Sequence, residues 1–144
     1  MNIKIKKLNE NATVPTHGSE YAAGYDLYAC IGESIEISAH ETVKIPTGLS
    51  MELPHGYFGA IFPRSGMATK DGVRMANCVA VIDEDYRGEW MLPLHNDTND
   101  TQLVTPNQRV AQLVLLPYQE LIFKEVIELN ETERGKGGFG STGT

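Results

Sequence analysis

The feature of this sequence that most limits its fold is a series of short runs in which every second residue is apolar. Side chains of a β-strand point alternately to its two faces, so this spacing predicts strands with one buried face. Glycine, proline, asparagine and aspartate residues typical of turns separate the runs, which favours an antiparallel sandwich or barrel. The apolar positions of the expected strands are Ile3/Ile5, Ile35/Ile37, Val43/Ile45, Leu49/Met51/Leu53, Phe58/Ala60/Phe62, Val73/Met75, Val79/Val81, Trp90/Leu92/Leu94, Ala111/Leu113/Leu115 and Phe123/Ile127/Leu129.

One short helix is expected among these strands. It would begin at an N-cap at Ser65, continue through Met67 to Lys70, and stop at Gly72. The chain changes character near its end, where glycine becomes frequent and the apolar pattern stops. We therefore expect one β domain over residues 1–133, followed by a flexible glycine-rich arm over residues 134–144.

Composition limits the partners that this chain can have. Its 144 residues hold 19 acidic and 12 basic side chains, a net charge of −7, whereas proteins that bind a nucleic-acid polymer carry a basic face. No apolar run approaches the roughly 18 residues of a membrane span. Cys30 and Cys78 lie far apart, and the N-terminus lacks the long apolar segment of a signal peptide. We expect no nucleic-acid polymer, no membrane and a cytoplasmic setting.

The stretch from Val79 to Glu89 is the strongest candidate for chemistry. An apolar run stops at Asp83, and two more acids, a tyrosine, an arginine and a glycine follow within a few residues. A carboxylate at the end of a buried strand can be held rigidly and partly dehydrated, as a general base must be. The alternative is a hairpin with solvated acids at its tip.

Two further stretches could bind an anion or an ion. Asp26 precedes the apolar Leu27 and could face a cavity or an ion, although a lone aspartate in a turn is more often a local cap. Arg64, Ser65 and Gly66 place a bidentate cation, a hydroxyl and free N–H groups at the expected helix start, which suits a phosphate. An ordinary N-cap beside a surface arginine is the other interpretation.

Two amides interrupt apolar faces. Asn77 shares an alternating face with Val73 and Val81, and its donor and acceptor pair could meet the edge of a pyrimidine base. Gln112 shares a face with Val110 and Val114 and also needs a polar partner. A bond to neighbouring backbone would satisfy either amide.

The glycine-rich arm from Arg134 to Thr144 carries two cations, one aromatic ring and several hydroxyls. Such a segment can wrap a phosphate chain while Phe139 stacks on a ring. A disordered terminus without a function is the alternative.

Together, five stretches resemble the trimeric deoxyuridine triphosphatase (dUTPase) family, whose five motifs occur in the same order. Ala80 and Asn107 depart from the pattern, because the family usually has glycine at both positions. Ala80 adjoins the implied base pocket and could alter its fit, whereas asparagine tolerates the turn geometry of glycine. The matching stretches are Ala23–Leu27, Pro63–Ala68, Asn77 with Val81–Gly88, Arg109–Gln112 and Arg134–Gly143.

The resemblance implies a jelly-roll-like all-β fold that forms a homotrimer, with active sites at the subunit boundaries. Each site would draw on three chains, and the arm over residues 134–144 of one chain would close over the site of another. An arm without core residues of its own is ordered only by a ligand or a neighbour.

The implied activity is Mg²⁺-assisted hydrolysis of dUTP to dUMP and pyrophosphate, which limits uracil incorporation into DNA and supplies dUMP for thymidylate synthesis. Asp83 would be the catalytic base that activates a water for in-line attack on the α-phosphate. Asp26 would contact the metal through water. Arg87 and Arg109 are expected to pair with the acids around Asp83 and hold their loop.

The resemblance also implies a set of substrate-binding residues, which fall into groups according to the part of dUTP that each would contact. The phosphates would be held by Arg64, Ser65, Gly66 and Gln112, and the γ end neutralised by Arg134, Ser141 and Thr142. Asn77, Val81 and Ile82 would recognise the uracil, and Phe139 would cover it. The deoxyribose would pack on Tyr86. Met91 and Gly140 complete the set.

Two other functions compete with this one. A dCTP deaminase has a related fold but needs a group that activates water at the ring carbon, and we find no candidate beyond the phosphate-hydrolysis set. A nucleotide-sensing or partner-binding protein on the same scaffold is compatible with the same residues.

Overall fold

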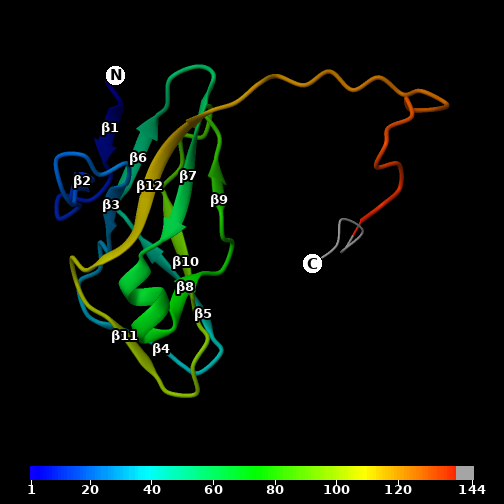
Figure 1. Ribbon diagram of the computed structural model, residues 1–144. Coiled ribbons are helices and arrows are strands. Elements are labelled where there is room, and N and C mark those ends of the chain that lie inside the picture. The colour runs from blue at the N-terminus through cyan, green and yellow to red at the C-terminus, as the bar shows by residue number, and fades with distance from the viewer. Residues whose placement is uncertain (139–144) are drawn as a thin grey trace.

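The computed structural model describes residues 1–138, which form β-strands and one short helix (Figure 1). The strands fall into four antiparallel sheets of two to five strands, none of which closes into a barrel among these residues. The predicted all-β, jelly-roll-like sandwich with one short helix is therefore confirmed. The strands are β1 (Lys4–Lys7), β2 (Thr16–His17), β3 (Tyr25–Tyr28), β4 (Ile35–Ile37), β5 (Thr42–Pro46), β6 (Leu49–Glu52), β7 (Tyr57–Pro63), β8 (Val73–Met75), β9 (Ala80–Ile82), β10 (Met91–Asn96), β11 (Gln102–Val104) and β12 (Arg109–Pro117).

The largest sheet has the order β2-β3-β12-β7-β9 and positions the candidate site. Its central strand β12 pairs antiparallel with β3 on one side and β7 on the other. Gln112 of β12 therefore lies opposite Asp26 of β3 and opposite Phe62 of β7. Three stretches that are far apart in the sequence meet along one line across this sheet.

The core follows the predicted alternation in most strands. Leu92 and Leu94 of β10 are buried, as are Ala111 and Leu113 of β12, while the residues between them are more exposed. Burial of each leucine side chain stabilises the fold by about 1.5–3 kcal/mol. The largest fully buried side chains are Trp90, Leu27, Ile37, Ile45, Leu49, Ile61, Met75, Leu92, Leu94, Val104, Val110 and Asn96.

The alternation predicted around β9 is wrong by one residue. Ala80 is buried, whereas Val79 and Val81 are 42% and 60% exposed. Strand β8 ends at Met75, and a bend over residues 76–79 breaks the face that β8 was predicted to share with the next strand. Asn77 lies exposed in this bend, so its predicted place on a buried strand face is also wrong.

The helix spans the predicted residues but is not capped by Ser65. Residues 65 and 66 are α-helical and lead into the π-helix η1 (Met67–Asp71), which has no side-chain bond at its N-cap, Gly66. The predicted N-cap at Ser65 is therefore wrong, and the Ser65 carbonyl accepts a 2.7 Å bond from the Thr69 hydroxyl. Gly72 ends the helix as predicted, in a left-handed conformation with φ of 64°.

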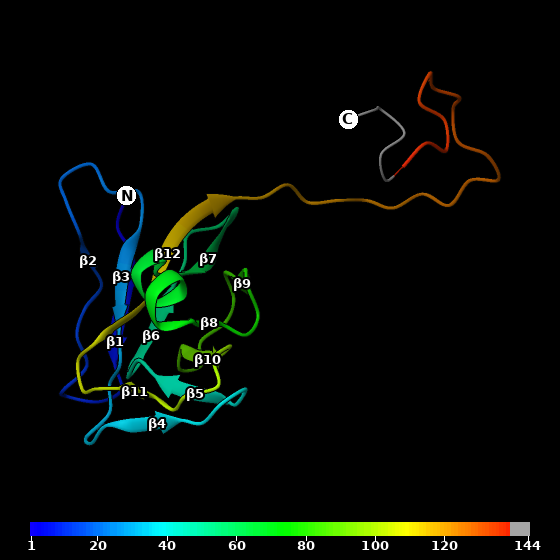
Figure 2. The same cartoon turned by 60° about the horizontal axis from the view of Figure 1, so that its bottom comes forward.

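Residues 118–138 leave the end of β12 and run away from the sandwich (Figures 1 and 2). The strand predicted over Phe123 to Leu129 is absent, because a strand needs a paired neighbour and the single chain offers none there. Its apolar side chains are exposed, with Phe123 at 89% and Ile127 at 102% of the reference area. Among residues 1–138, no helix is long and apolar enough to cross a membrane.

Candidate active site

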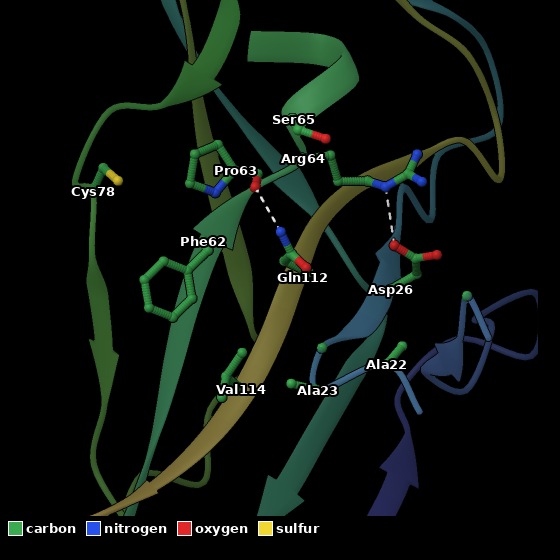
Figure 3. A pocket seen from close by; sticks show the side chains of 12 residues that line it. Ala22, Ala23, Asp26, Phe62, Pro63, Arg64, Ser65, Cys78, Gln112 and Val114 are labelled. Carbon is green, nitrogen blue, oxygen red and sulfur yellow. Dashed lines mark hydrogen bonds and ion pairs between the residues drawn. The ribbon is translucent and has the colours of Figure 1, made fainter. Parts of the chain in front are cut away.

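A cavity of about 610 Å³, named here the arginine pocket, lies where β3, β12 and the end of β7 meet (Figure 3). Asp26, Arg64, Ser65 and Gln112 line it, as does Gly24 just before β3. The pairing of β12 with both neighbours brings these residues together. The predicted phosphate-binding residues Arg64, Ser65 and Gln112 thus share one pocket, whereas Gly66 lines an adjoining cavity of about 540 Å³ that also borders Arg64.

Asp26 is held between two arginines, of which Arg64 lines this pocket and Arg109 lines the adjoining cavity. Its Oδ1 lies 2.9 Å from Arg64 Nε, and its Oδ2 lies 3.2 Å from Arg109 Nη1. Asp26 is only 8% exposed, and a carboxylate so buried requires paired cations or donors. The prediction that Arg109 pairs with the acids around Asp83 is therefore wrong, because the register of β3 and β12 sets it beside Asp26.

Ser65 and Gln112 supply neutral donors beside these cations. Because the Ser65 side chain does not cap η1, its hydroxyl at the exposed start of the helix is available to a ligand. Gln112 Nε2 donates a 3.0 Å bond to the carbonyl oxygen of Pro63. This is a bond to the backbone of the kind predicted as one way to satisfy the amide. The second Nε2 hydrogen can still bind an anion.

Another cavity of about 220 Å³, named here the Asp83 pocket, lies at the free edge of the same sheet. It is lined by Val81 and Ile82 of β9, by Met91 of β10, and by Asp83, Tyr86 and Glu89 of the loop between these strands. Asp83 is exposed, which agrees with the alternative of a hairpin with solvated acids at its tip. Tyr86 donates a 3.0 Å bond to the Glu89 carbonyl, which closes the loop.

The loop that carries Asp83 is fixed at two further points. Arg87 Nη1 donates to the backbone oxygens of Glu84 and Tyr86 at 2.6 and 3.1 Å. Arg87 thus holds the loop as predicted, but through carbonyls rather than carboxylates. The Glu84 carboxylate accepts bonds from His55 Nδ1 at 2.8 Å and from the Gly56 N–H at 2.6 Å. The His55 bond lowers the pKa of Glu84, and Glu84 raises the pKa of His55.

The structure places most of the predicted site residues of residues 1–138 in these two pockets. The arginine pocket and the Asp83 pocket have no lining residue in common. Asn77 lines neither, although its neighbour Cys78 reaches the arginine pocket. Arg134 lies on the extended arm, where its Nε donates 2.9 Å to the Gly137 carbonyl. The predictions for Phe139, Gly140, Ser141 and Thr142 fall outside the described residues.

Several residues of these pockets were not predicted from the sequence. Phe62, Val114 and Cys78 form an apolar wall of the arginine pocket, and Glu89 lines the Asp83 pocket. The alternation of β7 and β12 indicates which face Phe62 and Val114 occupy, but it does not indicate that this face borders a cavity.

The side chains present suit a metal ion that is bound mainly by a small-molecule ligand and only indirectly by the protein. Among residues 1–138, no group of three or more His, Cys, Asp or Glu side chains could hold a metal ion directly. Both Asp26 oxygens bind an arginine, yet an ionised carboxylate accepts about four bonds, so each oxygen can also accept one from a metal-bound water. The residues therefore fit an ion that contacts Asp26 through water.

One pocket of this β-sandwich holds an arginine, a serine and a glutamine, and a separate pocket holds two carboxylates and one aromatic ring. These groups suit a class of proteins that bind a phosphorylated small molecule. The model of the dUTPase family matches residues 10–143. The chain therefore belongs to the dUTPase family of enzymes.

Individual relatives cover almost the whole chain. The deoxyuridine 5'-triphosphate nucleotidohydrolase of Syntrophotalea carbinolica is 41% identical over 98% of this chain and 96% of its own length. The enzyme of that name from Nautilia profundicola is 44% identical over 99% of both chains. Among solved structures, a mutant dUTPase of Staphylococcus bacteriophage 80alpha with dUpNHpp has a TM-score of 0.89 at 25% identity, covering 99% of both chains.

Proposed function

We propose that this protein hydrolyses dUTP to dUMP and pyrophosphate, thereby limiting uracil incorporation into DNA and supplying dUMP for thymidylate synthesis. Family membership supports the reaction, as do relatives named for it at 41% and 44% identity. The similar phage enzyme binds the triphosphate analogue dUpNHpp. The observation that carries the proposal is that one chain has two pockets whose chemistries suit the two halves of a deoxynucleoside triphosphate.

The arginine pocket would take the triphosphate. Arg64 would bind phosphate oxygens with its free N–H groups while Asp26 holds its Nε at 2.9 Å. Ser65 and Gln112 would add a hydroxyl and an amide N–H in the same pocket, and Gly66 would add a backbone N–H from the adjoining cavity that also borders Arg64. The γ end would be neutralised by the arm, through Arg134, Ser141 and Thr142.

The Asp83 pocket would take the deoxyuridine and the attacking water. Tyr86, fixed by its bond to Glu89, would pack on the deoxyribose and leave no space for a 2′-hydroxyl. Asp83 would accept a proton from the water that attacks the α-phosphorus in line. The uracil would meet the exposed Val81 beside Ile82, Met91 and Asn77, with Phe139 and Gly140 of the arm covering it.

Magnesium fits this scheme as an ion bound by the triphosphate, where it would neutralise charge that develops on the phosphate oxygens. Asp26 would hold one metal-bound water while its arginines keep the carboxylate in place. The protein's own contribution would be to orient the phosphates, because it presents no direct ligand cluster among residues 1–138.

A complete site would require a homotrimer. The two pockets of one chain have no lining residue in common, which suits a site in which one subunit supplies the arginine pocket and another the Asp83 pocket. The exposed apolar side chains of residues 118–133, with Phe123 and Ile127 almost fully exposed, suit burial against a second copy. In this assembly, residues 1–133 would form the β domain and residues 134–144 of one chain would close over the site of another.

The test measures pyrophosphate release from dUTP, dCTP, dTTP and UTP side by side with Mg²⁺ present. We expect rapid release from dUTP and at least about a hundredfold lower kcat/KM for the others, because steric exclusion and unpaired polar groups both penalise the wrong nucleotide. Equal rates for all four, or ammonia release from dCTP, would contradict the proposal.

A further inference from the structure

We propose that Gly24 is a positioning residue for substrate binding, because the absence of a side chain at this position sets the orientation of the Gln112 amide. The inference rests on the proposed function, in which Gln112 binds a phosphate oxygen. It concerns a residue that lines the arginine pocket without offering a side chain of its own.

Gly24 and Gln112 are brought together by the pairing of β3 and β12. Gly24 precedes Tyr25, the first residue of β3, and Tyr25 pairs with Leu113 in the antiparallel register. Gln112 lies opposite Asp26, two residues from Gly24, and its side chain extends diagonally over the backbone at Gly24. A Cβ at Gly24 would lie 2.5 Å from Gln112 Oε1 and 3.4 Å from both its Cβ and Cδ.

The amide of Gln112 is fixed on its other side by a directional bond. Its Nε2 donates 3.0 Å to the Pro63 carbonyl, as Figure 3 shows, so the nitrogen faces β7 and Oε1 faces Gly24. This orientation leaves one Nε2 hydrogen for an anion beside Arg64, whose Nε is held by Asp26. Gly24 and Pro63 thus hold the amide from opposite sides.

Alanine at position 24 would displace the amide without straining the backbone. Gly24 is not among the residues with positive φ, so alanine can adopt its conformation. All three nearest atoms belong to the Gln112 side chain, and the closest is at its flexible end. The cheapest response is for the amide to rotate away, which breaks its bond to Pro63 and turns the free N–H away from the phosphate.

The experiment is a double-mutant cycle on dUTP hydrolysis with Gly24→Ala, Gln112→Ala and both together. Gly32→Ala is the matched control, because an added Cβ there meets nothing within 4 Å and Gly32 lies outside the arginine pocket. We expect each single variant of the cycle to raise KM about tenfold with kcat nearly unchanged, since a bond to a charged group is lost from ground state and transition state alike. The double variant should match Gln112→Ala within about twofold, and the control should match the wild type.

A structural readout accompanies the kinetics. In the wild type the Gln112 side-chain amide should give one pair of NMR signals shifted by its bond to Pro63, and Gly24→Ala should move them while Gly32→Ala does not. Thermal unfolding should show that both variants remain folded.

Two results would overturn the inference while leaving the proposed function intact: wild-type KM in Gly24→Ala, or an equal further rise in KM when Gly24→Ala is added to Gln112→Ala. The second result would mean that the new methyl group obstructs the substrate directly. Wild-type protein that does not hydrolyse dUTP would instead overturn the proposed function, and the inference with it.

Discussion

The Glu84 carboxylate accepts a 2.8 Å bond from His55, while Asp83, the residue before it, is exposed at the Asp83 pocket. The second Glu84 oxygen accepts the Gly56 N–H, and the Gly56 carbonyl in turn accepts the N–H of Tyr118. Tyr118 follows β12 directly, where the chain leaves the sandwich. One acid therefore ties the loop of the proposed catalytic base to the β6–β7 turn, which is itself bonded to the first residue after β12.

The His55–Glu84 pair predicts a measurable pH dependence. The bond to Glu84 raises the pKa of His55 above 6.5, and the same bond lowers the pKa of Glu84 below 4.5. The pair therefore stabilises the fold fully between pH 4.5 and 6.5, and loses this contribution as the pH rises through the raised His55 pKa or falls through the lowered Glu84 pKa. Glu84→Gln should return the NMR titration midpoint of the His55 ring towards 6.5. Asp85→Asn, on the same loop, is the control and should leave it raised. Equal midpoints in the wild type and Glu84→Gln would show that another group perturbs His55.

Asp83→Asn tests the proposed general base. The amide keeps the size of the carboxylate but cannot accept the proton of the attacking water, so turnover of dUTP should fall about 10²- to 10⁴-fold. The Kd for dUpNHpp should change little, because the phosphates bind elsewhere, in the arginine pocket. Asp85→Asn is again the matched control. Near-normal turnover of Asp83→Asn would remove Asp83 from the mechanism.

The strands were predictable wherever one face of a sheet is buried. Leu92 and Leu94 of β10 and Ala111 and Leu113 of β12 obey the period of two because each strand lies within a sheet against the core. Asn107 adopts φ of 59°, the left-handed conformation expected of a residue in place of glycine.

The predictions that were wrong share a physical cause, because each depends on which segments become neighbours in the folded chain. Arg109 pairs with Asp26 through a strand register that local pattern does not encode. Val81 is exposed because a bend resets the alternation before β9, which pairs only with β7 among the described strands. The pattern from Phe123 to Leu129 is that of a strand, but the single chain provides no partner for it.

Tyr86→Ala tests how the sugar is selected. The Tyr86 ring lies over Gly88, where an added Cβ would come within 2.6 Å of its Cζ, and its hydroxyl is fixed by Glu89. Removing the ring should open space for a 2′-hydroxyl and raise kcat/KM for UTP relative to dUTP by about 10- to 100-fold. Tyr86→Phe keeps the ring, so it should retain the selectivity. Undiminished selectivity in Tyr86→Ala would show that the sugar is read elsewhere.

Removal of residues 134–144 separates closure of the site from assembly. The shortened chain keeps Phe123 and Ile127, whose exposed side chains are proposed to bury against another subunit, so it should remain a trimer by sedimentation. It loses Arg134 and the hydroxyls proposed for the γ-phosphate, and kcat/KM for dUTP should fall about 10- to 100-fold or more, since each bond to a charged group contributes about 1.5–3 kcal/mol. The matched control ends the chain at residue 117 and should be monomeric. A monomer on removal of residues 134–144 alone would assign assembly to the arm itself.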